Sequence, residues 1–310
     1  MTDAAPMVEL AGLTRRFGDL VAVDALTLSV ARGELFGLVG PDGAGKTTTL
    51  RMLAGVLRPS GGDARLAGTS VVRDPERVKH SIAYMSQRFG LYADLTVAEN
   101  LEFYADLYRV RPGARPARVA RLFEFSALGP FRDRLAGQLS GGMKQKLALS
   151  CCLIHEPEIL LLDEPTFGVD PISRRDLWLI VHEMVAHGTT VVVSTAYLDE
   201  AERFDRLVLL HRGRSLAVDT AEALQNALPW AILSVPVQGV RDARVVAEAT
   251  PGVRRAAVFG DRLHLTVDSE AGTAPRIAAA LQAAGHAPGE LRRIVPSLED
   301  VFIERIAEAR

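Results

Sequence analysis

The sequence predicts an α/β domain built on a mixed sheet, followed by a small α+β domain. Strand-like runs and helical segments alternate between residues 159 and 211, a pattern typical of a parallel sheet covered by helices. A glycine-rich loop, GPDGAGKTT at residues 40–48, directly follows the apolar run Glu34–Val39. Beyond Pro229 the composition changes and a second pattern of strands and helices begins. Ligands bind at the carboxyl ends of parallel strands, so we expect the site in the first domain.

Composition and charge argue against several classes of protein. The 310 residues carry a net charge of −2, so no nucleic-acid partner held by bulk basic charge is expected. The cysteines Cys151 and Cys152 are adjacent in an apolar helical stretch, which indicates a reducing compartment rather than a disulfide framework. Residues 1–7 lack the pattern of a signal peptide, and no apolar run approaches the ~20 residues of a membrane-spanning helix. We expect a cytoplasmic protein that reaches a membrane only through a partner.

The first elements predict an antiparallel edge to the larger sheet. Turn residues such as Gly18 separate short strand-like runs at Met7–Leu10, Val21–Val23 and Leu26–Val30. After the glycine-rich loop, a helix is expected from Gly45 to about Val56, and then a strand that returns to Gly68.

A helical lobe is expected at about residues 88–157, inserted between strands. Thr96 is a predicted N-cap, and the three helical segments are Val97–Tyr108, Ala117–Ala127 and Gly141–His155. The short strand Ile82–Met85 precedes the lobe. After it, strands and helices alternate at Ile159–Asp163, Arg174–Ala186, Thr190–Ser194, Tyr197–Arg203 and Leu207–His211.

The last 80 residues or so predict a small ferredoxin-like sandwich, because their elements follow the order β-α-β-β-α-β. We place the domains at residues 1–228 and 229–310. The second contains no group of residues that chemistry would need, so it is expected to be dispensable for binding at the glycine-rich loop. The predicted elements are Trp230–Val235, Val240–Ala249, Arg254–Phe259, Leu263–Val267, Ala274–Ala284, Leu291–Val295 and a helix from Ser297.

The loop at residues 40–48 has the composition of a complete phosphate-binding loop. Gly40, Gly43 and Gly45 let successive backbone N–H groups point at one anion, and the helix that begins at Gly45 adds its positive dipole end. Lys46 is expected to reach the terminal phosphates of a nucleoside triphosphate, and Thr47 to place its hydroxyl on Mg²⁺. The alternative is a chance glycine-rich turn before a helix. The remaining loop residues expected to contact the nucleotide are Asp42, Ala44 and Thr48.

Two acidic residues end the apolar strand ILLLDE. Their position predicts that Asp163 lies near Mg²⁺ and that Glu164 lies beside an attacking water. Strand-end carboxylates alone are weakly specific. With the phosphate-binding loop upstream the pairing is strong, because two adjacent acids are costly to desolvate unless a cation or a reaction uses them.

A third motif, LSGGMKQK at Leu139–Lys146, lies between the loop and the acids. Ser140 would cap a helix, and Gly141 and Gly142 would expose backbone amides at its N-terminus. With this ordered set of motifs, residues 7–228 resemble the ATP-binding cassette (ABC) family of P-loop NTPases. In that family the LSGG segment of one subunit closes over the γ-phosphate bound to the other.

The resemblance implies roles for three further residues. Gln87 looks like the family's glutamine that senses Mg²⁺, water and the transmembrane partner. Asp170, in FGVDP, looks like the aspartate that crosses the dimer interface. Phe17 lies where an aromatic residue usually stacks on adenine, and a buried core phenylalanine is the alternative.

Two positions depart from the family pattern. Asp42 stands where asparagine is common and places an acid in an anion-binding loop. Ala196, in VVVSTAYLDEAE, stands where the family usually has histidine. That histidine bridges the γ-phosphate and the catalytic glutamate, so its loss resembles removal of one transition-state donor, worth roughly 2.7–4 kcal/mol.

The C-terminal segment PSLEDVFIERI, residues 296–306, resembles the small domain of drug-resistance and daunorubicin-type exporter ATPases. The resemblance predicts an ATPase subunit that binds ATP and Mg²⁺ on the inner face of the plasma membrane and drives a separate integral membrane permease. The second cassette domain of the nucleotide-bound dimer would be another copy of this chain or a histidine-bearing paralogue. Aromatic residues in Gln87–Tyr92, with Phe103, Tyr104 and Tyr108, would line a groove for the permease, or serve as core packing. Two alternatives remain: a slowly hydrolysing or non-hydrolysing regulatory subunit, and a soluble ATPase outside transport.

Overall fold

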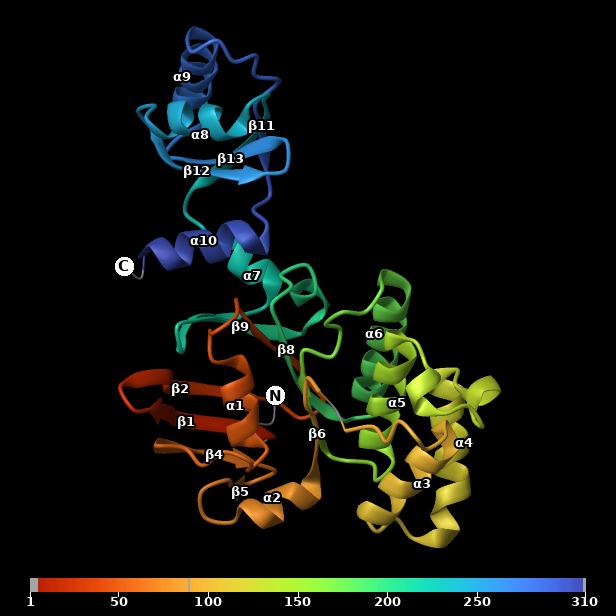
Figure 1. Cartoon of the computed structure of the whole chain (residues 1–310). Coiled ribbons are helices and arrows are strands. Elements are labelled where there is room, and N and C mark those ends of the chain that lie inside the picture. Colours follow the sequence, from red (N-terminus) through yellow and green to blue (C-terminus); the bar gives the residue numbers. More distant parts are fainter. Residues whose placement is uncertain (1–4, 89, 309–310) are drawn as a thin grey trace. The chain divides into compact units, whose positions relative to one another are not determined.

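The computed structural model describes residues 5–88 and 90–308, which form two compact units (Figure 1). The first unit reaches Thr220 and the second begins at Ala221. The second unit therefore starts earlier than the boundary expected near Pro229. The reason is helix α7 (Ala221–Asn226), which the sequence analysis did not recognise and which contacts α10 (Leu298–Glu308) of the same unit.

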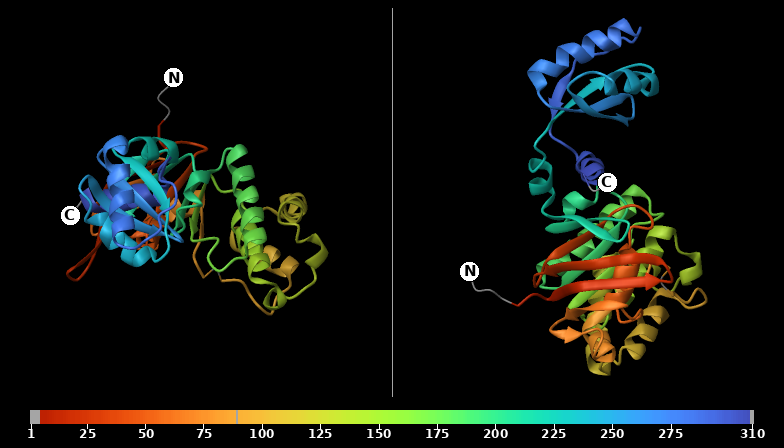
Figure 2. Two further views of the ribbon diagram at one scale, coloured as in Figure 1. Left: turned by 90° about the horizontal axis from the view of Figure 1, so that it is seen from above. Right: turned by 90° about the vertical axis from the view of Figure 1, so that its left-hand side faces the viewer.

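An antiparallel sheet forms one part of the first unit, in the order β2-β1-β4-β5. Its longest strands run side by side in Figure 2. The two short runs predicted after Gly18 form one continuous strand, because Ala25 adopts a left-handed backbone (φ 47°) and its N–H donates to Thr14 Oγ1 at 3.0 Å. This local irregularity keeps the ladder running. The strands are β1 (Val8–Phe17), β2 (Leu20–Val30), β4 (Gly61–Leu66) and β5 (Thr69–Ser70).

The second sheet has six strands in the order β10-β9-β3-β8-β7-β6. All run parallel except β10, which pairs antiparallel with β9. Strands β3, β7 and β8 are buried along their whole length, which explains the apolar run that each of them contains. The bounds are β3 (Leu35–Val39), β6 (Ile82–Met85), β7 (Ile159–Asp163), β8 (Thr190–Thr195), β9 (Arg206–His211) and β10 (Arg214–Asp219).

Helix α1 (Lys46–Leu53) joins the two sheets through a common core. Its buried residues Leu50 and Leu53 pack in one cluster with residues of β1, β3 and β7. The helix ends three residues before the predicted Val56. A further helix, α2 (Pro75–Ser81), begins at the N-cap Asp74 and was missed by the sequence analysis.

The helical lobe contains α3 (Val97–Leu107), α4 (Arg115–Ser126) and α5 (Gly141–Leu153), followed along the chain by α6 (Pro171–Ala186). Thr96 forms the predicted N-cap as part of a capping box with Glu99. Both cysteines are buried in α5, and burial raises the pKa of the Cys152 thiol. The helix predicted at Tyr197–Arg203 is only a 3₁₀ turn at Ala201–Arg203.

The second unit has the predicted β-α-β-β-α-β order, with an antiparallel sheet arranged β12-β13-β11-β14. Alternate residues of β13 face opposite sides. Leu263 and Leu265 join the core with α8 and α9, whereas His264 and Thr266 bond to side chains of α10. The remaining bounds are β11 (Ala231–Pro236), α8 (Val240–Glu248), β12 (Val253–Phe259), β13 (Arg262–Val267), α9 (Glu270–Ala283) and β14 (Arg292–Ile294).

Candidate functional site

The glycine-rich loop needs glycine for steric and conformational reasons. A Cβ atom on Gly40 would lie 2.2 Å from the carbonyl oxygen of Leu210. Gly45, the N-cap of α1, has φ 102°, and a Cβ there would lie 2.5 Å from the carbonyl oxygen of Ala22. The chain therefore curls tightly at the carboxyl end of β3, where the amides of a helix N-terminus suit an anion. This cradle fits a phosphate group.

Lys46 is buried beneath the loop, with 4% of its side chain exposed. Its ammonium donates to the carbonyl oxygens of Gly40 at 2.8 Å and Pro41 at 3.2 Å. A third partner is Glu164, whose Oε1 lies 3.2 Å from Nζ. A buried ammonium with these oxygen partners is held in place at the floor of the loop.

Asp163 ends β7 and is almost fully buried, with 1% of its surface exposed. Its Oδ1 accepts hydrogen bonds from the hydroxyls of Thr47 at 2.9 Å and Ser194 at 2.8 Å. The Tyr84 hydroxyl donates to Oδ2 at 3.2 Å. One carboxylate and one hydroxyl are oxygen ligands suited to Mg²⁺, which usually keeps several waters and needs few protein ligands.

Tyr84 is a site neighbour that the sequence analysis did not identify. Burial, together with the charge of Asp163, raises the pKa of its phenol to about 12. The hydroxyl therefore stays protonated and donates to Asp163 at any physiological pH.

Glu164 follows Asp163 with its backbone in the left-handed region, at φ 50°. This conformation is uncommon for a residue with a Cβ and is found where surrounding structure enforces it. The Glu164 N–H donates to Ser194, to the hydroxyl at 3.0 Å and to the carbonyl at 3.2 Å. Its Oε2 accepts from Gln87 Nε2 at 2.9 Å. The turn thus aims the carboxylate between Gln87 and Lys46.

Lys46, Thr47 and Glu164 line one cavity of about 650 Å³, whereas Gly40 and Asp163 do not line it themselves. Phe17 lies at its wall with 45% of its surface exposed, so the alternative of a buried core phenylalanine is wrong. The Arg15 guanidinium covers the Phe17 ring at 4.5 Å. Lining residues from the predicted set are Phe17, Asp42, Gly43, Ala44, Gly45, Lys46, Thr47, Thr48, Gln87 and Glu164; residues not predicted are Leu20, Val21, Ala22 and Arg212.

The LSGG segment does not line this cavity within the described chain. Ser140 caps α5 as predicted, its Oγ accepting from the N–H of Met143 at 3.3 Å. Asp170 caps α6, its Oδ1 accepting from the N–H of Ser173 at 3.0 Å. A Cβ on Gly142 would lie 2.2 Å from Ser173 Oγ, so the two helix starts pack against each other. Their exposed N-termini are free to meet a second molecule.

Ala196 lies exposed just after the carboxyl end of β8. The flanking Thr195 is fixed, because its hydroxyl donates to Glu200 at 2.7 Å and accepts from the N–H of Tyr197 at 3.0 Å. These two bonds hold residues 195–200 in a turn, where the sequence predicted a helix. No imidazole is available from this position.

The aromatic residues proposed to line a groove form a connected cluster. The rings of Tyr92 and Phe103 are 4.4 Å apart, and the Tyr104 hydroxyl donates to the carbonyl of Gly90 at 2.8 Å. The Tyr108 ring stacks on His155 at 3.9 Å. Phe89, part of the same predicted segment, lies outside the described residues.

Comparisons with known proteins agree with this geometry. Residues 23–167 match the family model described as ABC transporter. The chain is 35% identical over 301 residues to the daunorubicin resistance ATP-binding protein DrrA2 of Streptomyces coeruleorubidus, covering 96% of this chain and 94% of that protein. A solved structure described as the ATP binding subunit of an ABC transporter matches with a TM-score of 0.65 and 30% identity, over 71% of this chain and 92% of that one.

A further relative is longer than this chain. The sequence is 44% identical over 317 residues to the probable multidrug ABC transporter ATP-binding protein YbhF of Escherichia coli (strain K12). That match covers 100% of this chain, which spans only about half, 53%, of the relative. With the ordered motifs, the fold and these similarities in agreement, the chain belongs to the ATP-binding proteins of the ABC transporter family.

Proposed function

We propose that the chain is an ATPase subunit that couples ATP binding and hydrolysis to export by a separate integral membrane permease. The observation that carries the proposal is the convergence of Lys46, Asp163 and Glu164 beside a glycine-rich phosphate cradle. Within the described residues, no helix is long and apolar enough to cross a bilayer. We place the subunit at the cytoplasmic face of the plasma membrane, held there by the permease.

Thr47 and Asp163 would hold Mg²⁺, with Gln87 nearby. When bound, the ion neutralises charge on the β- and γ-phosphates. Asp163 is prepared for this role, because Tyr84 and Ser194 already fix both of its oxygens. Within the described chain, no group of three His, Cys, Asp or Glu residues offers a competing metal site.

Glu164 would act as the general base that orients and deprotonates the attacking water. Its carboxylate is held by Gln87 on one oxygen and by Lys46 on the other. A triphosphate would compete with Glu164 for the Lys46 ammonium, since both are anionic. Binding of substrate would thus free the base while Gln87 keeps it oriented.

The segments Ser140–Gly142 and Asp170 would complete the site on a second cassette domain. Two observations support this assignment. Neither segment lines the cavity of its own chain, and both lie at helix N-termini; at Ser140–Gly142 the backbone amides favour an anionic phosphate. The partner would be a second copy or a paralogue with histidine at the position of Ala196.

The substitution Glu164→Gln tests this function. It should keep or raise MgATP affinity in equilibrium binding, because a neutral side chain no longer competes with the triphosphate for Lys46, while phosphate release falls at least about 100-fold, because the base is lost. It should also trap an ATP-dependent dimer in size-exclusion chromatography. Unchanged phosphate release, or a monomer with saturating MgATP at high protein concentration, would overturn the proposal.

One observation favours a second candidate, a nucleotide-gated subunit that hydrolyses ATP slowly or not at all. Ala196 supplies no donor at the position where the family places an imidazole. Single-turnover hydrolysis by the purified chain separates the two candidates: rapid turnover rules out the gated subunit, whereas ATP-driven dimerisation without turnover rules out the ATPase.

A further inference from the structure

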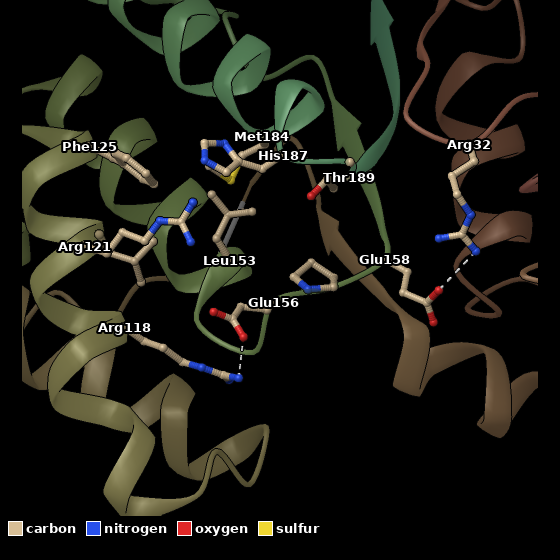
Figure 3. Close-up of a pocket in the computed structure, with 13 residues that line it drawn as sticks. Arg32, Arg118, Arg121, Phe125, Leu153, Glu156, Glu158, Met184, His187 and Thr189 are labelled. Atoms are coloured by element: carbon tan, nitrogen blue, oxygen red, sulfur yellow. Dashed lines mark hydrogen bonds and ion pairs between the residues drawn. The ribbon is translucent and has the colours of Figure 1, made fainter.

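A second cavity, of about 320 Å³, lies within the first unit and shares no lining residue with the nucleotide cavity. It opens between α4, the C-terminal ends of α5 and α6, and the turns that precede β7 and β8 (Figure 3). Both strands start here and end at the phosphate-binding side. The cavity is thus at the opposite edge of the parallel sheet, where the proposed ATPase chemistry has no use for it.

One part of the cavity is apolar. Leu122, Leu153 and Met184 are buried, with 6%, 6% and 8% of their surfaces exposed, and Phe125 extends the same wall. Its volume is in the range of sites that bind small molecules, which are lined mainly by apolar groups with a few polar ones.

The charged residues of the cavity are paired, with one exception. Arg118 pairs with Glu156 and also donates to the Ile154 carbonyl at 3.2 Å. Arg32 pairs with Glu158 at 3.6 Å. Both carboxylates are therefore already engaged by cations, as the dashed lines in Figure 3 show.

Arg121 is the exception. It forms no ion pair or hydrogen bond with any residue of the described chain, and its guanidinium lies 4.9 Å from the centre of the Phe125 ring. In Figure 3 this guanidinium extends from α4 toward Leu153. Arg121 is exposed, so this planar group with five N–H donors stands at the outer edge of the apolar wall, where a carboxylate is its geometric and electrostatic complement.

We propose that this cavity binds a small carboxylate with an apolar body. The apolar body would lie on the wall formed by Leu122, Leu153 and Met184, and the carboxylate would pair with Arg121. The His187 side chain also lines the cavity, its Nδ1 bonded to the Glu183 carbonyl at 2.7 Å. Since a carbonyl only accepts, Nδ1 carries the hydrogen, and the ring is fixed by this bond.

A ligand in this cavity would affect the proposed ATPase through the helices that connect the two sites. The proposal of a carboxylate site does not require that the chain is an ATPase. Helix α5 runs from Ser140 to the cavity at Leu153, and α6 runs from the cap Asp170 to the cavity at His187. A ligand would bridge α4 to the turns before β7 and β8. It would therefore stiffen the connection between the helical lobe and the sheet.

Three probes of one shape test the site: 2-naphthoate, its neutral amide 2-naphthamide and the cation 2-naphthamidinium. We expect calorimetry on the full chain without nucleotide to detect 2-naphthoate at millimolar or lower concentration, and the other two at least about fivefold more weakly. A hydrogen bond to a buried charged group would supply a larger factor, but Arg121 is exposed and solvent screens the pair. Because no nucleotide is present, failure here leaves the ATPase proposal unaffected, and failure of the ATPase proposal leaves this result unaffected.

Arg121→Gln should weaken 2-naphthoate at least about fivefold, toward the affinity of the amide. The matched control is Arg132→Gln, at an arginine on the same lobe that is 63% exposed and does not line the cavity; it should bind like the wild type. Bound 2-naphthoate should slow hydrogen exchange in α4 and at residues 187–190. Preference for the amidinium, no detectable binding of 2-naphthoate, equal binding by Arg121→Gln, or protection confined to other segments would each overturn the proposal.

Discussion

The Lys46 ammonium and the Glu164 carboxylate form an ion pair, with Nζ and Oε1 3.2 Å apart. Both side chains are buried or nearly so, with 4% and 12% exposed. The proposed phosphate-binding residue and the proposed base therefore hold each other before either acts. Removing one member leaves the other charge poorly compensated, which is costly away from solvent.

Lys46→Ala should lower ATP affinity or turnover at least about tenfold, because hydrogen bonds to charged groups contribute ~1.5–3 kcal/mol. Equilibrium binding of MgATP and phosphate release measure the two quantities. Lys79→Ala is the control, since Lys79 is exposed and, among the residues that the structure describes, pairs only with Glu76 on α2. Wild-type values for both quantities in Lys46→Ala would contradict the role assigned to the loop.

Ala196→His should accelerate hydrolysis by the chain by up to about 100-fold, the effect of one transition-state donor. Residue 196 is exposed and directly follows β8, and Ser194 of that strand pairs with Asp163 in the sheet, so an imidazole added here starts from the edge that carries the two acids. Single-turnover phosphate release measures the effect, and Asp199→His, at a nearby exposed position, is the control. If the wild type hydrolyses briskly and Ala196→His adds nothing, another group already fills the role.

Gly142→Ala should lower the free energy of unfolding by ~1–3 kcal/mol, the usual cost of overpacking. The new Cβ would lie 2.2 Å from Ser173 Oγ and 2.3 Å from its Cβ. Gly141→Ala is the matched control, because its nearest neighbour, the Gly168 carbonyl, is 3.9 Å away. Urea denaturation compares the two variants, and adding Ser173→Gly to Gly142→Ala should recover part of the loss. Equal stability of the two single variants would refute the close contact.

His155 should make the protein less stable as the pH falls below about 6.5. Burial is the main cause that lowers its pKa; Arg118 acts in the same direction, and the hydrogen bond to Ile82 opposes them. In this range the unfolded chain takes up a proton that the folded chain resists, so the free energy of unfolding decreases by up to ~1.4 kcal/mol per pH unit.

His155→Gln should therefore narrow the difference in stability between pH 7.5 and 5.5 measured by urea denaturation. The variant loses the stacking on Tyr108 at both pH values, so the difference between them is the informative quantity. His182→Gln, at an exposed residue of α6, should keep the difference seen in the wild type. A difference that His155→Gln leaves unchanged would refute the assignment.

Local chemistry made much of this fold predictable. The caps Thr96 and Ser140 accept hydrogen bonds from backbone N–H groups three residues away. Gly40 and Gly45 could be recognised from the loop motif, although the carbonyls that exclude a side chain there belong to the distant residues Leu210 and Ala22. The sequence predicted two short strands where β2 is continuous, because the hydroxyl of Thr14, eleven residues away, supports the irregular backbone at Ala25.

The unpredicted parts of the site depend on contacts between distant segments. Tyr84 and Ser194 bond to Asp163 from strands 79 and 31 residues away, and nothing in their own neighbourhoods marks them. Arg212 lines the nucleotide cavity from the left-handed turn between β9 and β10. Only the order of strands in the sheet brings these residues together.

The missing Cβ of Gly142 also has a consequence for assembly. Because Ser173 sits in the space a side chain would occupy, the starts of α5 and α6 are packed into one continuous edge. A docking surface that is already ordered loses little conformational freedom when it associates. Any molecule that recognises Ser140 therefore meets Asp170 in fixed register, and recognition of the two becomes a single event.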